Sequence, residues 1–299
     1  MPELITPTEL LWRGLRIHYN DRRGRCRRPL PPFASARFSP MPLLRQDDPP
    51  AVRVENQAGQ SALLIVCDHA SARVPAALGD LGVPARAFGQ HVAIDLGAEA
   101  ITLELARLMD AGAVIAGFSR LVVDCNRDPT DPEWMPKQSD GYDVPANCNA
   151  TPADRHARFD EIFAPYHAMV AAEIDRLTAR GAVPVVFSVH SFTPVFAGRV
   201  RPWHAGVLWN RDGRVAVPLI AALRTHADLV VGDNEPYSGQ TKAYTLQRHA
   251  HAAGLPHAAI EVRQDLAADT KAAAQWATIL ADALRPILAA RDVQERCLF

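Results

Sequence analysis

The sequence predicts an α/β fold of three layers, in which helices cover both faces of a central mixed, mostly parallel sheet. Two kinds of segment predict it. Residues 62–67 and 183–189 are short, continuously apolar runs, which is typical of strands that are buried on both faces. Residues 94–111 and 153–180 carry apolar side chains at helical spacing. Segments of these two kinds alternate along the chain, and this alternation indicates a layered α/β domain.

The remaining elements follow the same pattern, and one long loop interrupts it. Further strands are expected at residues 113–115, 121–123, 205–208, 229–231 and 257–262, and further helices at residues 215–225, 241–253 and 269–290. The helix over residues 153–180 ends at Gly181, a residue type that commonly follows the last helical turn. Residues 128–152 are rich in Pro, Asp, Asn and Gly and are too long for a simple connector. Loops of this length often cover active sites.

The chain is expected to contain one catalytic α/β domain, residues 51–299, preceded by a basic, proline-rich extension, residues 1–50. Its 299 residues, of which 48% are hydrophobic, are enough for a substantial core. The extension has many arginines and little apolar periodicity, so we expect it to be disordered. It is interpreted either as a basic arm for an anionic surface or as a start-site extension, with the working chain beginning near Met41. Its paired arginines are not followed by the apolar run of a secretion signal.

Composition argues against several classes of function. A net charge of -1 and a pI near 6.8 give no overall electrostatic case for nucleic acid or an anionic membrane. No window is apolar enough to cross a membrane, and no phosphate-binding glycine motif is present. Five cysteines without a CxxC pair indicate a reducing cytoplasm. One aromatic and basic run is short and isolated, so we interpret it as a half-buried strand with pocket-lining side chains. It contains Arg201, Trp203, His204, Trp209 and Arg214.

Residues 119–127 place several polar groups after an apolar stretch. Arg127 can form a two-pronged pair with a carboxylate, Asn126 can donate beside it, and Asp124 can orient Arg127. Such a group is suited to binding a small acidic substrate. The alternative is a strand end that is closed by a structural salt bridge.

Two histidines and a glutamate follow or end separate buried strands. His69, His190 and Glu261 each stand at or near the predicted end of a strand, where ligands bind in open α/β sheets. Two imidazoles with a carboxylate suit zinc and leave a fourth position for water, while a further carboxylate serves as a general base. Each histidine alone is more simply a polar group that the nearby backbone satisfies.

Two aspartates are candidates for the carboxylate ligand. Asp95 could supply it, although an Asp just before a helix is by default an N-cap. Asp68 is adjacent to His69 and is either an alternative ligand or the partner of a ligating imidazole, because such rings usually hold a carboxylate on their other nitrogen.

Glu261 lies within an apolar stretch, where burial would raise its pKa toward the range that is useful for moving a proton. The alternative is a salt bridge to Arg263, although side chains two apart on a strand share a face, so both could line the site. Tyr237, in a turn, could reach a substrate or an oxyanion, or could pack on the surface.

Taken together, these motifs resemble the N-formylglutamate amidohydrolase family, which is related in fold and chemistry to the zinc carboxypeptidases, aspartoacylase and succinylglutamate desuccinylase. The resemblance covers about residues 63–287. It is carried by Asp68-His69-Ala70-Ser71, Asp95-Leu96-Gly97-Ala98, Ser119-Arg120 with Asp124-Cys125-Asn126-Arg127, Val189-His190-Ser191-Phe192-Thr193-Pro194, Arg201-Pro202-Trp203-His204, and Glu261-Val262-Arg263-Gln264-Asp265-Leu266.

The resemblance implies a zinc-hydrolase-like fold and a Zn2+ ion that is bound by His69 and His190. The wider group takes a second ligand from a glutamate three residues after the first histidine, where this chain has Ala72. Asp95 is therefore the expected carboxylate ligand. Asp68 and Asp124 are expected to support the ligands and the carboxylate clamp.

The resemblance also implies the reaction. Water activated by zinc and deprotonated by Glu261 would attack the N-acyl carbonyl of a small acidic N-acylamino acid, most simply N-formyl-L-glutamate. Asn126 and Arg127 would hold a substrate carboxylate, with Arg120, Arg263 and Tyr237 as further contacts, and residues 134–142 could close over the substrate. The alternatives are a related enzyme for an N-succinyl, N-acetyl or cell-wall amide, and a metal-free binding homologue.

Overall fold

The computed structural model of the protein describes residues 42–299, which belong to one compact unit, Met41–Phe299. The extension expected over residues 1–50 therefore lies mostly outside the described residues. Its last part packs on the domain, because Leu43 is buried. The backbone N–H groups of Leu43 and Leu44 donate to the two carboxylate oxygens of Glu161, at 2.9 and 2.8 Å. The chain is thus anchored to the domain before the first strand begins.

The described residues form a seven-stranded sheet, in the order β1-β3-β2-β6-β11-β9-β10, and two short hairpins. The strands are β1 (Val52–Glu55), β2 (Leu63–Cys67), β3 (Gly112–Ala116), β4 (Gln138–Ser139), β5 (Tyr142–Asp143), β6 (Val185–Phe192), β7 (Val195–Phe196), β8 (Arg199–Val200), β9 (Ala205–Leu208), β10 (Val231–Asp233) and β11 (His257–Arg263). The hairpins are β4-β5 and β7-β8.

Strand direction decides where the polar residues meet. β3, β2, β6 and β11 pair in parallel, whereas β1 is antiparallel to β3 and β9 is antiparallel to β11. β10 is parallel to β9. The sheet is therefore mixed and mostly parallel, as the sequence predicts, and the carboxyl ends of β2, β6 and β11 lie at one edge. Ligands bind at this edge in open α/β sheets.

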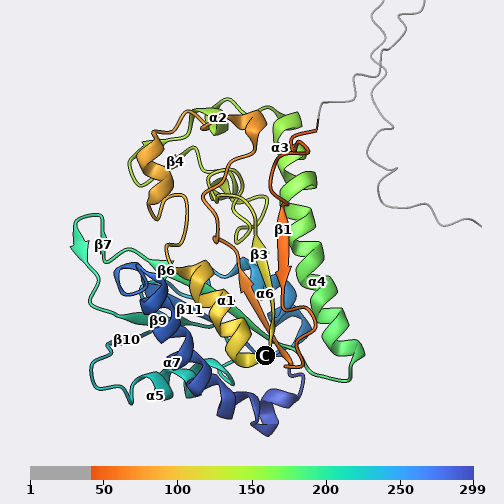
Figure 1. Ribbon diagram of the computed structural model, residues 1–299, viewed down its shortest axis with the longest axis vertical. Coiled ribbons are helices and arrows are strands. Elements are labelled where there is room, and N and C mark those ends of the chain that lie inside the picture. Colours follow the sequence, from red (N-terminus) through yellow and green to blue (C-terminus); the bar gives the residue numbers. More distant parts are fainter. Residues whose placement is uncertain (1–41) are drawn as a thin grey trace, which may run out of the picture. The chain divides into compact units, whose positions relative to one another are not determined.

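Helices cover both faces of the sheet (Figure 1). The α-helices are α1 (Ala98–Met109), α2 (Pro145–Cys148), α3 (Pro152–Arg158), α4 (Ala164–Ala179), α5 (Ala216–Leu223), α6 (Tyr244–His249) and α7 (Thr270–Leu288). Short 3-10 helices span Ala76–Leu78, Ala85–Gly89, Pro132–Trp134, His251–Ala253, Gln264–Leu266 and Arg291–Gln294. Side chains of α1, α5 and α7 share one apolar cluster with the sheet, and those of α4 and α6 share a second cluster on the opposite face. The predicted three-layer architecture is confirmed.

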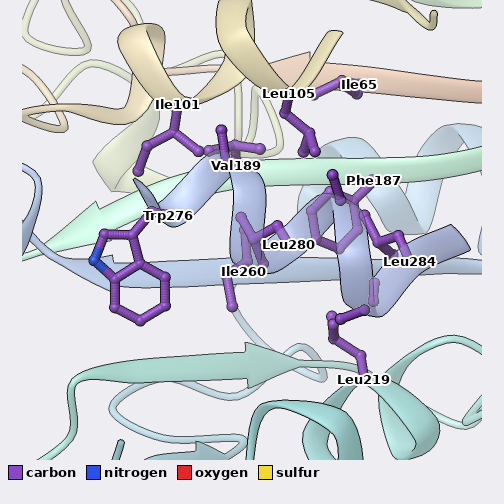
Figure 2. Close-up of a cluster of buried hydrophobic side chains, with 14 of the residues drawn as sticks. Ile65, Ile101, Leu105, Phe187, Val189, Leu219, Ile260, Trp276, Leu280 and Leu284 are labelled. Atoms are coloured by element: carbon purple, nitrogen blue, oxygen red, sulfur yellow. The ribbon is translucent and has the colours of Figure 1, made fainter. Parts of the chain in front are cut away.

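The larger cluster explains why α7 and α1 form where they do. On α7, Trp276, Leu280 and Leu284 recur at a spacing of four residues, so they lie on one face of the helix and are buried. Figure 2 shows them packed toward Phe187 of β6 and Ile260 of β11. Each such side chain contributes about 1.5–3 kcal/mol when it is fully buried. This cluster holds the strands on which the site residues stand.

The sequence prediction was wrong at residues 121–123, which do not form a strand. Leu121, Val122 and Val123 are buried in a third apolar cluster, together with Trp134 of the long loop. The backbone N–H of Asp124 donates to the carbonyl of Trp134 at 2.8 Å, so the loop pairs with this segment in place of a strand. A continuously apolar run indicates burial, but it does not distinguish a sheet from a packed loop.

The helix predicted over residues 153–180 is present with one irregular turn. Between α3 and α4 the backbone widens into a π-helical turn, Phe159–Phe163. Pro165 lies in the first turn of α4 and has no backbone N–H, so the hydrogen bond that a regular helix would make there is lost. Within the described part of the chain, no helix is long and apolar enough to cross a lipid bilayer.

Candidate active site

The parallel pairing of β6 and β11 brings His190 and Glu261 directly side by side, because they are register partners. His69 follows the end of β2, which pairs with β6 on its other side. All three side chains are buried, with 2%, 4% and 7% exposure for His69, His190 and Glu261. Three residues that are far apart in the sequence therefore meet at one edge of the sheet.

Asp95 reaches the same place because it does not cap the helix that follows it. The helix α1 starts at Ala98, and its N-cap is Gly97, which has a φ of 82°. A Cβ at Gly97 would lie 2.4 Å from the carbonyl oxygen of Ala267, so only glycine fits this turn. The Asp95 N–H donates to the carbonyl of His69 at 3.0 Å. The turn thus leaves the Asp95 side chain facing the two histidines.

The Asp95 carboxylate lies between the two imidazole rings. Its Oδ2 is 2.8 Å from Nδ1 of His190 and 3.2 Å from Nδ1 of His69. Each of these residues offers one ligand atom, and these atoms all lie within 4.8 Å of one another. In the part of the chain that the structure describes, this buried group could hold a metal ion.

Nε2 of each imidazole ring, on the side away from Asp95, also has a polar partner. Nε2 of His69 lies 2.8 Å from Oδ1 of Asp124. Nε2 of His190 lies 2.9 Å from Oγ of Ser188 and 3.3 Å from Oδ2 of Asp68. The carboxylates of Asp124 and Asp68 thus lie behind the rings at the Nε2 atoms, and Nδ1 of each ring faces the centre of the group. This arrangement is typical of histidines that bind metals.

These contacts correct one expectation, that Asp124 orients Arg127, and they place Asp68 at the ring of His190. Asp68 contacts His190 rather than its sequence neighbour His69. The Asp124 carboxylate contacts His69 and Arg120, and its Oδ1 accepts the backbone N–H of Asn126. Among the described residues it forms no hydrogen bond with the Arg127 side chain, and Arg127 contacts Asp124 only through its backbone N–H, which donates to the Asp124 carbonyl. The reason is local: with no strand at residues 121–123, the turn points Asp124 at the ring.

The charges of the group favour a cation at its centre. Burial acts to lower the pKa of His190, but its hydrogen bonds with Asp68 and Asp95 outweigh burial and raise that pKa well above 6.5. Burial acts to raise the pKa of Asp68, but the His190 contact lowers it to about 2. Asp95 likewise has a lowered pKa, mainly through His69 and His190 against burial. The carboxylates therefore stay charged, which favours a cation between the two rings.

Arg120 belongs to this network. Its Nη1 donates to Oδ1 of Asp95 and its Nη2 to Oδ2 of Asp124, both at 3.1 Å. Burial acts to lower the pKa of Arg120, but the two carboxylates raise it. The guanidinium thus fixes the carboxylate that lies between the rings and the carboxylate that supports His69.

Glu261 is a buried carboxylate of a different kind. Its Oε2 has no hydrogen-bond partner among residues 42–299. Burial is the largest cause that raises its pKa, from 4.5 to about 7, and the charge of Asp95 adds to it while His190 opposes it. A carboxyl group with this pKa can accept and return a proton near neutral pH.

One cavity of about 260 Å3 is lined by the histidine-aspartate-histidine group together with Arg120, Asp124 and Glu261. Asn126, Arg127 and Tyr237, expected at the site, line it as well. Arg263 is not among its lining residues, because its guanidinium turns to Asp265, with Nε and Oδ1 2.8 Å apart. The structure thus brings together all of the expected substrate-contact residues except Arg263.

The cavity also has lining residues that the sequence did not single out. Oε2 of Glu133 accepts from Nζ of Lys242 at 2.8 Å and from Nε of Arg127 at 3.3 Å. Glu133 belongs to the long loop, so this loop lines the cavity, although Trp134 beside it is buried in the third apolar cluster. Ser188 does not line the cavity but contacts Nε2 of His190. The sequence could have indicated this contact, because Ser188 lies two residues before His190 on the same face of β6.

The fold and the site define a class: an α/β protein with a buried histidine-aspartate-histidine group beside a carboxylate of raised pKa, as in metal-assisted hydrolysis. The sequence model of a family described as N-formylglutamate amidohydrolase matches residues 61–268. The chain belongs to this family.

Two solved structures are similar to this chain. A crystal structure of a gene product from Agrobacterium tumefaciens is 38% identical, with a TM-score of 0.80, over 83% of this chain and 98% of that one. The crystal structure of N-formylglutamate amidohydrolase from Ralstonia eutropha JMP134 is 19% identical, with a TM-score of 0.58, over 80% and 97%. The second likeness supports the fold. No curated protein matches the chain.

Metal analysis tests the histidine-aspartate-histidine group. We expect purified protein to bind about one metal ion per chain, and His69→Ala and His190→Ala to lose it. Asp124→Asn should bind the ion 10–100-fold more weakly, about the effect of removing a group that supports a ligand. His226→Ala, at an exposed histidine, is the control and should keep the ion. Full metal content in both ligand variants would contradict this assignment.

The raised pKa of Glu261 predicts a change in stability with pH. The folded state holds the Glu261 proton more tightly than the unfolded state, so the stabilisation from this proton is lost as the pH rises from about 4.5 through about 7. A glutamine side chain at position 261 would be uncharged over this whole pH range. With a chelator present, Glu261→Gln should raise the free energy of unfolding by about 3 kcal/mol at pH 8.

Urea unfolding at pH 5 and pH 8 measures this effect. The variant should differ little from wild type at pH 5, because Glu261 is then protonated in the folded state. Glu295→Gln, at an exposed glutamate, should change stability little at either pH. Equal stability of Glu261→Gln and wild type at pH 8 would show that Glu261 is not held protonated in this way.

Proposed function

We propose that the protein hydrolyses the N-acyl amide bond of a small acidic N-acylamino acid, and that its substrate is N-formyl-L-glutamate, which gives L-glutamate and formate. One observation carries the proposal: Glu261, whose Oε2 has no hydrogen-bond partner among residues 42–299, stands beside His190 in the cavity that also contains Asp95 and His69. A base and a metal-binding group at one cavity are what amide hydrolysis requires.

The donor atoms support Zn2+ as the ion. Two imidazole nitrogens and one carboxylate oxygen, from His69, His190 and Asp95, are a ligand set that zinc uses in catalytic sites with one position left for water or substrate. When bound, the ion would polarise the acyl carbonyl and lower the pKa of water. Asp124, Asp68 and Arg120 would keep the three ligands in place.

Glu261 would move the proton. Its carboxylate accepts a proton from the attacking water as the new C–O bond forms, and then gives that proton to the amine nitrogen as the C–N bond breaks. The net reaction consumes one water and returns Glu261 to its starting state. Its Oε2 has no partner among the described residues, so no internal hydrogen bond has to break first.

Arg127 and Asn126 would hold a carboxylate of the substrate. Arg127 lines the cavity and already binds the carboxylate of Glu133, which lies between it and Lys242. A substrate carboxylate would take this position and accept hydrogen bonds from the Arg127 guanidinium. The cavity of about 260 Å3 matches a small substrate.

The cysteine usage suits a protein of the reducing cytoplasm.

A panel of substrates tests the proposal. Protein reconstituted with zinc is expected to release the amino acid from N-formyl-L-glutamate faster than from N-acetyl-L-glutamate, N-succinyl-L-glutamate or N-formyl-L-glutamine. The rates are compared as kcat/KM. No preference for the formyl group would leave a general N-acyl hydrolase. No turnover of any member, with zinc bound, would favour a binding protein.

The Glu261→Gln variant separates binding from chemistry. Loss of the general base should lower kcat roughly 10²–10⁴-fold. Metal content should stay at the wild-type level, because Glu261 is outside the ligand group. If the variant keeps the wild-type kcat, Glu261 is not the general base.

A further inference from the structure

Arg201 is a buried arginine without an acidic partner. It has 8% exposure and follows the hairpin β7-β8. None of the ion pairs among the described residues includes it. A buried charge without a partner is costly, so its place in the fold needs a reason.

Aromatic rings and two hydrogen bonds hold the guanidinium in one position. Its central carbon lies 4.7 Å from the ring centre of Phe196, 4.9 Å from that of Tyr237 and 5.7 Å from that of Phe192. Nη1 donates to the carbonyl of Thr193 at 3.3 Å, and Nη2 donates to the hydroxyl oxygen of Tyr237 at 3.0 Å. Ring faces attract a cation but leave its charge unneutralised.

The bond to Tyr237 fixes the direction of a proton. A guanidinium has donors only, so the tyrosine oxygen must be the acceptor in this bond. The hydroxyl proton of Tyr237 therefore points away from Arg201. The described residues provide no acceptor for it, while Tyr237 lines the cavity together with Glu261 and Arg127.

We infer that Arg201 is a positioning residue that holds the Tyr237 hydroxyl as a hydrogen-bond donor to a carboxylate of the bound substrate. This inference rests on the proposed function and deepens it. A full negative charge suits the position, because the uncompensated charge of Arg201 lies directly behind the donor. Arg201 itself does not line the cavity, so it acts through Tyr237.

A double-mutant cycle on the zinc-loaded protein tests the inference. Arg201→Met keeps an apolar stem beside the rings and removes the donors, and Tyr237→Phe removes the hydroxyl. Each should raise KM for N-formyl-L-glutamate, and Kd for L-glutamate measured by calorimetry, about tenfold, which corresponds to about 1.4 kcal/mol. In both, kcat should stay within about twofold of wild type.

The double variant should be no worse than either single variant, because both remove the same hydrogen bond to the substrate. Arg201→Lys should recover part of the affinity, and it also serves if Arg201→Met fails to fold. Arg199→Met, at an exposed arginine in the same hairpin, is the control and should change neither constant.

The outcomes distinguish the two proposals. If wild type cleaves N-formyl-L-glutamate but the two substitutions act additively, or lower kcat and leave KM unchanged, the positioning role is wrong and the proposed function stands. If wild type neither binds L-glutamate nor cleaves N-formyl-L-glutamate, both are wrong.

Discussion

The position of Asp95 between two imidazole rings is the constraint on which the rest of the site depends. Its Oδ2 faces Nδ1 of both His69 and His190, and this is possible only because Gly97 makes the turn before α1. Three strands position the two rings and Glu261. The parallel order of β2, β6 and β11 brings the rings and Glu261 to one edge, so the topology of the sheet and the chemistry of the site have the same origin.

The charges divide the cavity into two parts. Around the rings, carboxylates outnumber the single guanidinium of Arg120, which suits a cation. Toward the opening, Arg127 and Lys242 share one carboxylate, that of Glu133, which suits an anionic substrate. Glu261 lines the same cavity beside His190, and burial raises its pKa to about 7. One cavity therefore contains groups that suit a cation, groups that suit an anion and a carboxyl group with a raised pKa.

Sequence reasoning predicted the fold class, the strands that are buried on both faces, and the meeting of His69, His190 and Glu261, because apolar runs and strand ends follow from local pattern. It was wrong where pattern is ambiguous. Residues 121–123 are buried in a loop cluster rather than in the sheet, and this changes the partner of Asp124 from Arg127 to His69. The contact of Lys242 with Glu133 joins residues 109 positions apart, which no local pattern reveals.

His69, His190 and Asp95 are proposed to form one metal site, in which the Nδ1 atoms of both rings face the ion. Diffraction at the zinc absorption edge from crystals of the zinc-loaded protein tests it most directly. We expect an anomalous peak bonded to Nδ1 of both histidines and to a carboxylate oxygen of Asp95. A peak on the Nε2 atoms, or no peak at this group while zinc binds elsewhere, would contradict it.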